Sequence, residues 1–283
     1  MTKRRLILFI IFVIALGYFT FLLIPLLGLN YGAGSSIIIL AVGMFVPTIS
    51  SFLVRLITKE GFQNLYLKPN LRANGKFYIA IYFVPTLLLL LSAVLYFLIL
   101  PNSFDSDFTL LKSVSPNKNV AVIMAIAIAQ ILVIGPIVNI IPTLGEEIGW
   151  RGYLLPKLRE LMSDRKAIIV SGIIWGIWHA PVIVLGHNYE KDYMGYPYLG
   201  IIAMVLFCVM LSIIESYTFF KTSSVIPAAM IHSTVNAGAA LPIMVAKSGY
   251  NTLLGPAITG VVGAIPFIVV SLVIFIKIGK KTT

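Results

Sequence analysis

Eight apolar runs, each long enough to cross a bilayer as a helix, follow one another along this 283-residue chain. They cover residues 6–28, 35–57, 77–100, 120–142, 167–186, 198–220, 222–245 and 254–277. The composition agrees, because 59% of the residues are hydrophobic, 11% are charged and the mean hydropathy is +1.00. A soluble globular domain is therefore excluded. The sequence predicts an all-α, polytopic transmembrane helical bundle of about eight spans, forming one membrane-embedded domain over residues 1–283.

Basic residues are concentrated in alternate connections and at the two termini, which together hold 17 of the 21 lysines and arginines. These segments are residues 3–5, 55–76, 151–166, 221 and 277–281, and the other connections hold Lys112, Lys118, Lys191 and Lys247. The positive-inside rule therefore predicts that both termini and the 143–166 segment face the cytoplasm. A net charge of +11 would suggest nucleic acid for a soluble protein, but this distribution indicates the lipid bilayer as partner and no nucleic acid.

Three segments depart from a simple series of spans. The N-terminal run is too long for a signal peptide, so we expect a retained first transmembrane helix. The seventh run has two prolines and several polar residues, which predicts a broken or partly re-entrant helix. The 120–157 stretch is too long for one perpendicular span, so we expect a break near Pro136 or Pro142. The single cysteine, Cys208, excludes an intramolecular disulfide and is interpreted as a packing residue.

Ionisable residues within such runs are costly, which makes a functional role the first hypothesis for each, with structural ion pairs as the competing one. The set comprises Glu146, Glu147, Arg151, His179, Glu215 and His232, with Asn139 and Asn236 as uncharged companions. Glu215 is six residues before Lys221, so a local partner or snorkelling toward the cytoplasmic boundary is expected. His187 falls in an outer connection and is predicted to be solvated.

The stretch "TLGEEIGWRGYLLPKL", residues 143–158, holds two adjacent glutamates. On a helix, Glu147 and Arg151 are spaced i, i+4 with the acid first, the favourable order for an ion pair. Glu146 points about 100° away. The spacing predicts that Arg151 neutralises Glu147 and that Glu146 faces another group, unless both acids belong to a solvated cytoplasmic face.

His179 ends the segment "GIIWGIWH", and His232 and Asn236 share one helix face at i, i+4 spacing. Packing and an interhelical polar clamp are the structural alternatives for these residues. Counted at ~1.5 Å per helical residue from the nearest basic residue, Glu146, His179 and His232 lie ~16, ~20 and ~16 Å deep. Side chains from three helices at one depth predict a single polar site within the membrane.

A carboxylate, two imidazoles and a carboxamide in a dry pocket suit the activation of water by a general base and the stabilisation of an oxyanion. The same groups could hold a metal such as zinc, with Glu146, His179 and His232 as ligands and water as the fourth. No HExxH segment is present to favour that second arrangement. Both chemistries remain open at the level of residue types.

Three motifs give the chain a resemblance to the CAAX protease and bacteriocin-processing (CPBP, formerly Abi) family of intramembrane endopeptidases. The family patterns EExxxR, FxxxH and HxxxN correspond to Glu146-Glu147 with Arg151, to "WGIWH" ending at His179, and to His232 with Asn236. The run "GEEIGWRGYLLPKL" makes the match more specific. Trp175 stands where the family has Phe, which predicts altered pocket packing with the chemistry retained.

The resemblance implies roles for these residues. Glu146 and His179 would activate the hydrolytic water, His232 and Asn236 would form the oxyanion site, and Glu147, Arg151 and Trp175 would support them. The motifs occupy about 143–240, so the division is into N-terminal spans without motifs (1–118), a catalytic core (120–245) and a last span with a basic tail (254–283). We favour a mechanism that requires no cofactor, with zinc dependence as the alternative.

The resulting prediction is an intramembrane endopeptidase that hydrolyses a membrane-associated peptide or protein, in CAAX-type or bacteriocin/pheromone-type processing. The substrate is expected to enter from the cytoplasmic side. The alternatives are a non-catalytic membrane scaffold or immunity/regulatory protein of the same fold, and a proton-coupled transporter. The lone cysteine, the many isoleucines and the short connections fit a multi-pass protein of a bacterial plasma membrane.

Overall fold

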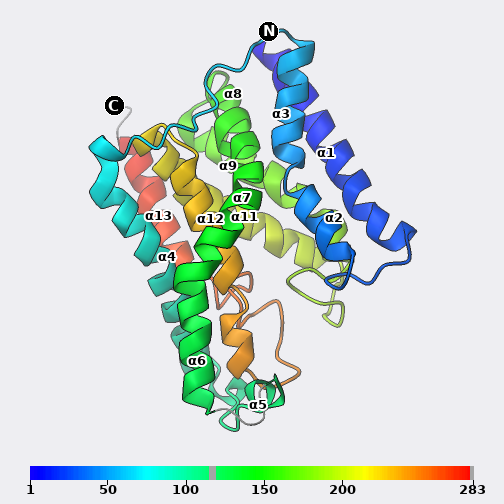
Figure 1. Cartoon of the computed structure of the whole chain (residues 1–283), viewed down its shortest axis with the longest axis vertical. Coiled ribbons are helices and arrows are strands. Elements are labelled where there is room, and N and C mark those ends of the chain that lie inside the picture. The colour runs from blue at the N-terminus through cyan, green and yellow to red at the C-terminus, as the bar shows by residue number, and fades with distance from the viewer. Residues whose placement is uncertain (115–118, 281–283) are drawn as a thin grey trace.

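The computed structural model describes residues 1–114 and 119–280, and the regular secondary structure in this part of the chain consists of helices, without strands. Lys118, Lys281 and the chain end at 281–283 lie outside the described residues. The all-α class is therefore confirmed (Figure 1). The α-helices are α1 Thr2–Leu26, α2 Ser36–Gly43, α3 Val46–Ile57, α4 Leu71–Ile99, α5 Thr109–Val114, α6 Val120–Ala129, α7 Gly135–Gly149, α8 Leu155–Arg159, α9 Asp164–Trp178, α10 Ala180–Val184, α11 Tyr198–Thr222, α12 Ile226–Gly238 and α13 Ile265–Lys280.

Four helical segments are long and apolar enough to cross a membrane: α1, α4, α11 and residues 226–245, where α12 continues into the 3₁₀ helix η4, Leu241–Val245. A fifth is added if α2 and α3, which meet at 44°, are counted as one broken span. Each of the eight predicted runs coincides at least in part with a helix. The number of spans and the side on which the termini lie stay predictions.

The motif segment belongs to a helical stretch that runs from Val120 to Arg159 without the predicted break. Two π-helical turns, η2 Gln130–Ile134 and η3 Trp150–Leu154, interrupt the α-helical pattern instead. Pro136 lies two residues after the end of the first π turn, so the wider turn accommodates its missing N–H without ending the helix. The second π turn carries Arg151, beside the glutamates.

Glycines allow the helices that carry the motifs to approach closely. A Cβ on Gly172 or Gly176 of α9 would lie 2.6 or 2.5 Å from the Cα atoms of Val209 and Val205 on α11. On α7, a Cβ at Gly149 would lie 2.4 Å from Cβ of Pro47 at the start of α3. Small residues of this kind permit tight packing in lipid, where apolar side chains alone provide little drive for association.

The two ends of the molecule differ in composition. The start of α1, the connection between α3 and α4, α8 and the end of α13 lie at one end, while α5 and the connection after α10 lie away from it (Figure 1). The first group of segments holds nine of the 21 lysines and arginines, whereas α5 and the connection after α10 hold one each, so we call the first group the basic end. Along the helices between the two ends, exposed apolar side chains form lipid-facing stripes, as on α4 with Ile79, Phe83, Leu87, Leu91 and Leu98.

Candidate active site

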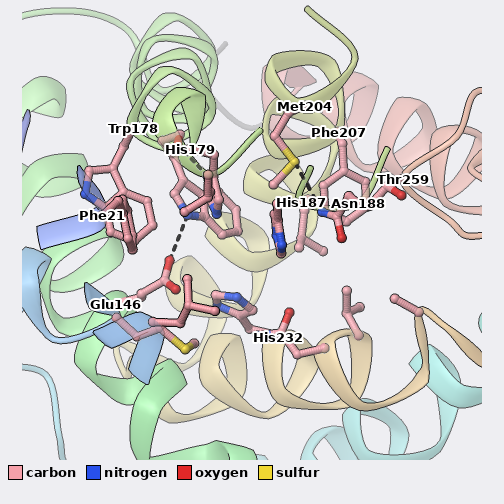
Figure 2. A pocket seen from close by; sticks show the side chains of 18 of the residues that line it. Phe21, Glu146, Trp178, His179, His187, Asn188, Met204, Phe207, His232 and Thr259 are labelled. Carbon is pink, nitrogen blue, oxygen red and sulfur yellow. Dashed lines mark hydrogen bonds between the residues drawn. The ribbon is translucent and has the colours of Figure 1, made fainter. Parts of the chain in front are cut away.

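The side chains predicted to converge do line one cavity, with a volume of about 260 Å³. Glu146 comes from α7, His179 from the end of α9, and His232 and Asn236 from one face of α12 (Figure 2). Asn139, their predicted companion, donates instead to the Gly135 carbonyl of its own helix at 3.0 Å. The tertiary fold therefore joins residues of three helices that are far apart in the sequence.

Glu146 is almost fully buried, and two indoles orient its carboxylate. Nε1–H of Trp175 donates to Oε2 at 2.8 Å, and Nε1–H of Trp150 donates to the same oxygen at 3.1 Å. Trp175 occupies the position where the CPBP pattern has Phe, and a phenyl ring could not supply this donor. The substitution thus adds a polar contact to the packing change that was expected.

His179 follows the last residue of α9, two positions before Pro181. Its Nδ1 lies 2.9 Å from the carbonyl oxygen of Trp175, which can only accept, so Nδ1 carries the proton in this contact. In the neutral ring, Nε2 is then free to accept a proton. Cys208 is fully buried with Sγ 3.9 Å from the same Nδ1, and it belongs to the hydrophobic core, as expected.

His232 is held by the second glutamate. Its Nδ1 lies 3.1 Å from Oε1 of Glu147, and because a carboxylate only accepts, Nδ1–H is the donor. The ring also packs edge-on against Trp175, with the ring centroids 5.2 Å apart. Asn236, one turn further along α12, is exposed where it lines the cavity. The link between His232 and Glu147 joins residues 85 positions apart, which helix periodicity could not reveal.

The predicted ion pair between Glu147 and Arg151 is present at 2.9 Å, and both side chains are fully enclosed, which excludes a solvated acidic face. Arg151 also forms an ion pair with Glu215 of α11 and stacks over Trp175, with its guanidinium carbon 4.4 Å from the ring centroid. Glu215 is fully buried, so the snorkelling expected for it is wrong and a partner on another helix takes its place. This contact is an ion pair without hydrogen-bond alignment.

His187 was predicted to be solvated, but it lines the cavity, so all three histidines of the chain meet there. Its ring lies parallel to that of His179, at an interplanar angle of 7° and a centroid distance of 6.2 Å. Tyr31, from the connection between α1 and α2, forms a hydrogen bond with its Nδ1. Burial lowers the pKa of His187 to about 4, so this imidazole is neutral near pH 7.

The arrangement does not favour the predicted metal ligands. In the described part of the chain, one group of three possible metal ligands has its ligand atoms within 4.8 Å of one another: Glu147, Glu215 and His232. This group includes neither Glu146 nor His179, which were predicted as ligands together with His232. Arg151 contacts both carboxylates of that set. The guanidinium thus supplies the positive charge that a metal ion would bring to this cluster.

Together, the fold and the cavity define a class: a helical membrane protein with a buried carboxylate, imidazoles and a carboxamide around one cavity. Residues 128–238, which include all three motifs, match the Rce1-like family, described as type II CAAX prenyl endopeptidase Rce1-like. Over 47 residues, the chain is 43% identical to CAAX prenyl protease 2 of Methanococcus maripaludis. This second match covers about 17% of each of the two proteins. The resemblance to the CPBP family is confirmed, and residues 128–238 form an Rce1-like segment.

Proposed function

We propose that the protein is an intramembrane endopeptidase of a bacterial plasma membrane, which hydrolyses a peptide bond in a membrane-associated peptide or protein. The observation that carries this proposal is the position of Glu146, fixed by two indoles in the same cavity as His179, His232 and Asn236. The partial similarity to a protein named CAAX prenyl protease 2 supports the same reaction class. Both CAAX-type and bacteriocin or pheromone processing fit this class.

Glu146 and His179 take the role of activating water. Nδ1–H of His179 is directed at the Trp175 carbonyl, so Nε2 can accept a hydrogen bond from a water molecule in the cavity. Glu146 removes a proton from that water molecule while the water oxygen forms a bond to the carbonyl carbon of the substrate. The proton is then passed to the amine nitrogen as the C–N bond breaks, which leaves a carboxylic acid and a free amine.

His232 and Asn236 take the role of stabilising the oxyanion. The amide of Asn236 donates directly, whereas His232 can donate from Nε2 only when both ring nitrogens carry protons. The contact of His232 with Glu147, which is itself paired with Arg151, holds the imidazole ring in place.

Replacing Glu146 with Gln tests this proposal. Gln keeps an oxygen that accepts from Trp150 and Trp175 but cannot take up a proton, so cleavage should fall by at least ~100-fold with folding intact. The readout is the set of new protein termini in membranes of wild-type cells that is absent from Glu146→Gln cells. Glu160→Gln, at an exposed glutamate of the basic end, is the matched control and should preserve these termini.

The outcomes separate the competing functions. Unchanged termini in Glu146→Gln cells would exclude Glu146 as the general base. A deletion phenotype that is fully restored by Glu146→Gln would favour the membrane scaffold over the enzyme. Repeating the measurement with a zinc chelator addresses the cofactor, and we expect cleavage to persist because Arg151 occupies the compact carboxylate cluster.

A further inference from the structure

The lining residues of the cavity that belong to connections between helices all lie at one end of the molecule. Tyr31, His187, Asn188 and Thr259 line it, and they come from the connections after α1, after α10 and before α13. These connections follow the ends of helices that start at the basic end, so they lie opposite it. Among the described residues that line the cavity, none comes from a connection at the basic end.

The helical lining residues lie toward the same end. Phe21 is five residues from the end of α1, and Asn236 is two residues from the end of α12. On α11, which runs in the other direction, Met204 is ~9 Å from the start of the helix at Tyr198. Exposed lining residues are found here as well, at Asn188 and Asn236. The cavity is therefore open to the surroundings on the side away from the basic end.

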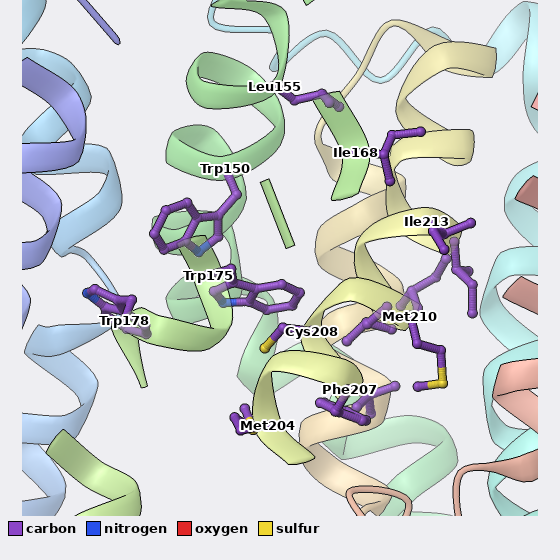
Figure 3. Packing of buried hydrophobic residues seen from close by; sticks show 14 of the residues in the cluster. Trp150, Leu155, Ile168, Trp175, Trp178, Met204, Phe207, Cys208, Met210 and Ile213 are labelled. Atoms are coloured by element: carbon purple, nitrogen blue, oxygen red, sulfur yellow. The ribbon is translucent and has the colours of Figure 1, made fainter. Parts of the chain in front are cut away.

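On the basic side, fully buried residues close the cavity. Trp150 contacts Trp178 edge-on, with ring centroids 5.8 Å apart, and Phe9 packs on Trp150 at 6.0 Å. Leu155, the first residue of α8, is equally enclosed and lies on one side of Trp150, whereas Met204 and Phe207 lie on the other side (Figure 3). The ion cluster around Arg151 adds a second enclosed layer. A polypeptide could not reach Glu146 through this packing without unfolding it.

From this geometry we propose that the substrate enters from the end opposite the basic end, which the positive-inside rule makes the extracytoplasmic face. The substrate class is then a membrane-anchored peptide or protein whose scissile segment is exposed outside the cytoplasm. This differs from the approach from the cytoplasm expected from the sequence. The identity of the bound molecule as a substrate rests on the proposed function, whereas the location of the opening does not depend on it.

The residues that line the cavity also indicate which kind of substrate segment would fit it. Glu146 is the only acidic side chain among the described lining residues, no lysine or arginine is among them, and His187 is neutral near pH 7. Aromatic and thioether side chains, such as Phe21, Met44 and Phe207, form much of the remaining wall. An uncharged, extended segment of the substrate therefore suits the entrance better than a charged one.

Cysteine labelling of intact cells tests the direction of the opening. The chain has one native cysteine, Cys208, which is fully buried and gives the background. Cysteines are introduced separately at Asn188 in the entrance, at Met194 in the same connection, which is 88% exposed, and at Lys68 at the basic end. A membrane-impermeant maleimide should label the Asn188 and Met194 variants in intact cells and the Lys68 variant only after permeabilisation.

Labelling of Lys68→Cys in intact cells, with Met194→Cys protected until permeabilisation, would overturn the proposal. The Met194 variant keeps this test decisive if Asn188→Cys fails to fold. The entrance itself is tested by treating intact Asn188→Cys cells with a bulky impermeant maleimide, which should abolish the termini that depend on Glu146. The same treatment of Met194→Cys should leave them.

Termini that persist on fully labelled Asn188→Cys would exclude this entrance even if the proposed protease activity is correct. If no termini depend on Glu146, the proposed function fails, while the accessibility of residues 188 and 194 still reports the side of the opening.

Discussion

At the scale of single residues, Trp175 links most of the candidate site. Its indole N–H donates to Glu146, its carbonyl accepts from His179, and its ring faces His232 and carries the guanidinium of Arg151. A phenylalanine at this position would keep the packing and the carbonyl but lose the donor. The residue therefore orients the carboxylate through a contact that a motif pattern requiring only an aromatic would not reveal.

Trp175→Phe should reduce cleavage about 10-fold, which corresponds to the loss of a hydrogen bond to a charged group worth ~1.5 kcal/mol. Trp150 continues to donate to Glu146, so activity should not vanish. The measurement is the rate of formation of the Glu146-dependent termini, compared with the thermal stability of the purified protein. Trp178→Phe is the control, because the buried N–H of Trp178 has no hydrogen-bond partner among the described residues. An equal loss in both variants would contradict the role of the donor.

At the scale of elements, the position of His179 depends on how closely α9 packs against α11. The glycines at 172 and 176 face the α11 backbone one turn apart, and a side chain at either would separate the helices. On the opposite side of the site, Gly145 and Gly149 place α7 against Phe45 and Pro47. These glycines allow Glu146 and His179 to lie on opposite walls of one small cavity.

Gly172→Ala should destabilise the protein by ~1–3 kcal/mol, because the added Cβ would lie 2.6 Å from backbone atoms of Val209 and the helices must move apart. Thermal unfolding of the detergent-solubilised protein measures this effect. Gly75→Ala is the matched control, since a Cβ there meets no atom within 4 Å and alanine favours the helix. Equal melting temperatures for the two variants would show that the close packing of α9 against α11 does not contribute to the stability of the protein.

At the scale of the whole molecule, a buried ionic cluster joins α7, α11 and α12. Arg151 contacts Glu147 and Glu215, and Glu147 in turn contacts His232. Removing one charge from such a cluster leaves its partner without compensation in a dry interior. The cluster therefore couples the folding of the bundle to the position of His232, one of the two residues proposed to stabilise the oxyanion.

Arg151→Met should lower the stability of the protein by ~3–5 kcal/mol, because two buried carboxylates lose their cation. Adding Glu215→Gln should recover part of this loss, since Glu147 retains His232. The yield of monodisperse protein and its melting temperature provide the measurement. If the double variant is no more stable than Arg151→Met, the ion pair with Glu215 contributes little to the fold.

The sequence alone determined the features that depend on local periodicity. Apolar runs predicted an all-helical membrane protein, i, i+4 spacing predicted the ion pair between Glu147 and Arg151, and the motifs indicated the residues of the cavity. These follow from helix geometry, in which residues one turn apart necessarily meet.

Only the tertiary structure decided the contacts between helices. It paired Glu215 with Arg151, placed His187 in the cavity, connected His232 to Glu147, replaced the expected break by π turns and oriented the cavity away from the basic end. Each of these depends on which face of one helix meets another. That choice is made by close packing at positions such as Gly172 and Gly176, and the hydrophobicity of a membrane helix, apolar on nearly every side, does not encode it.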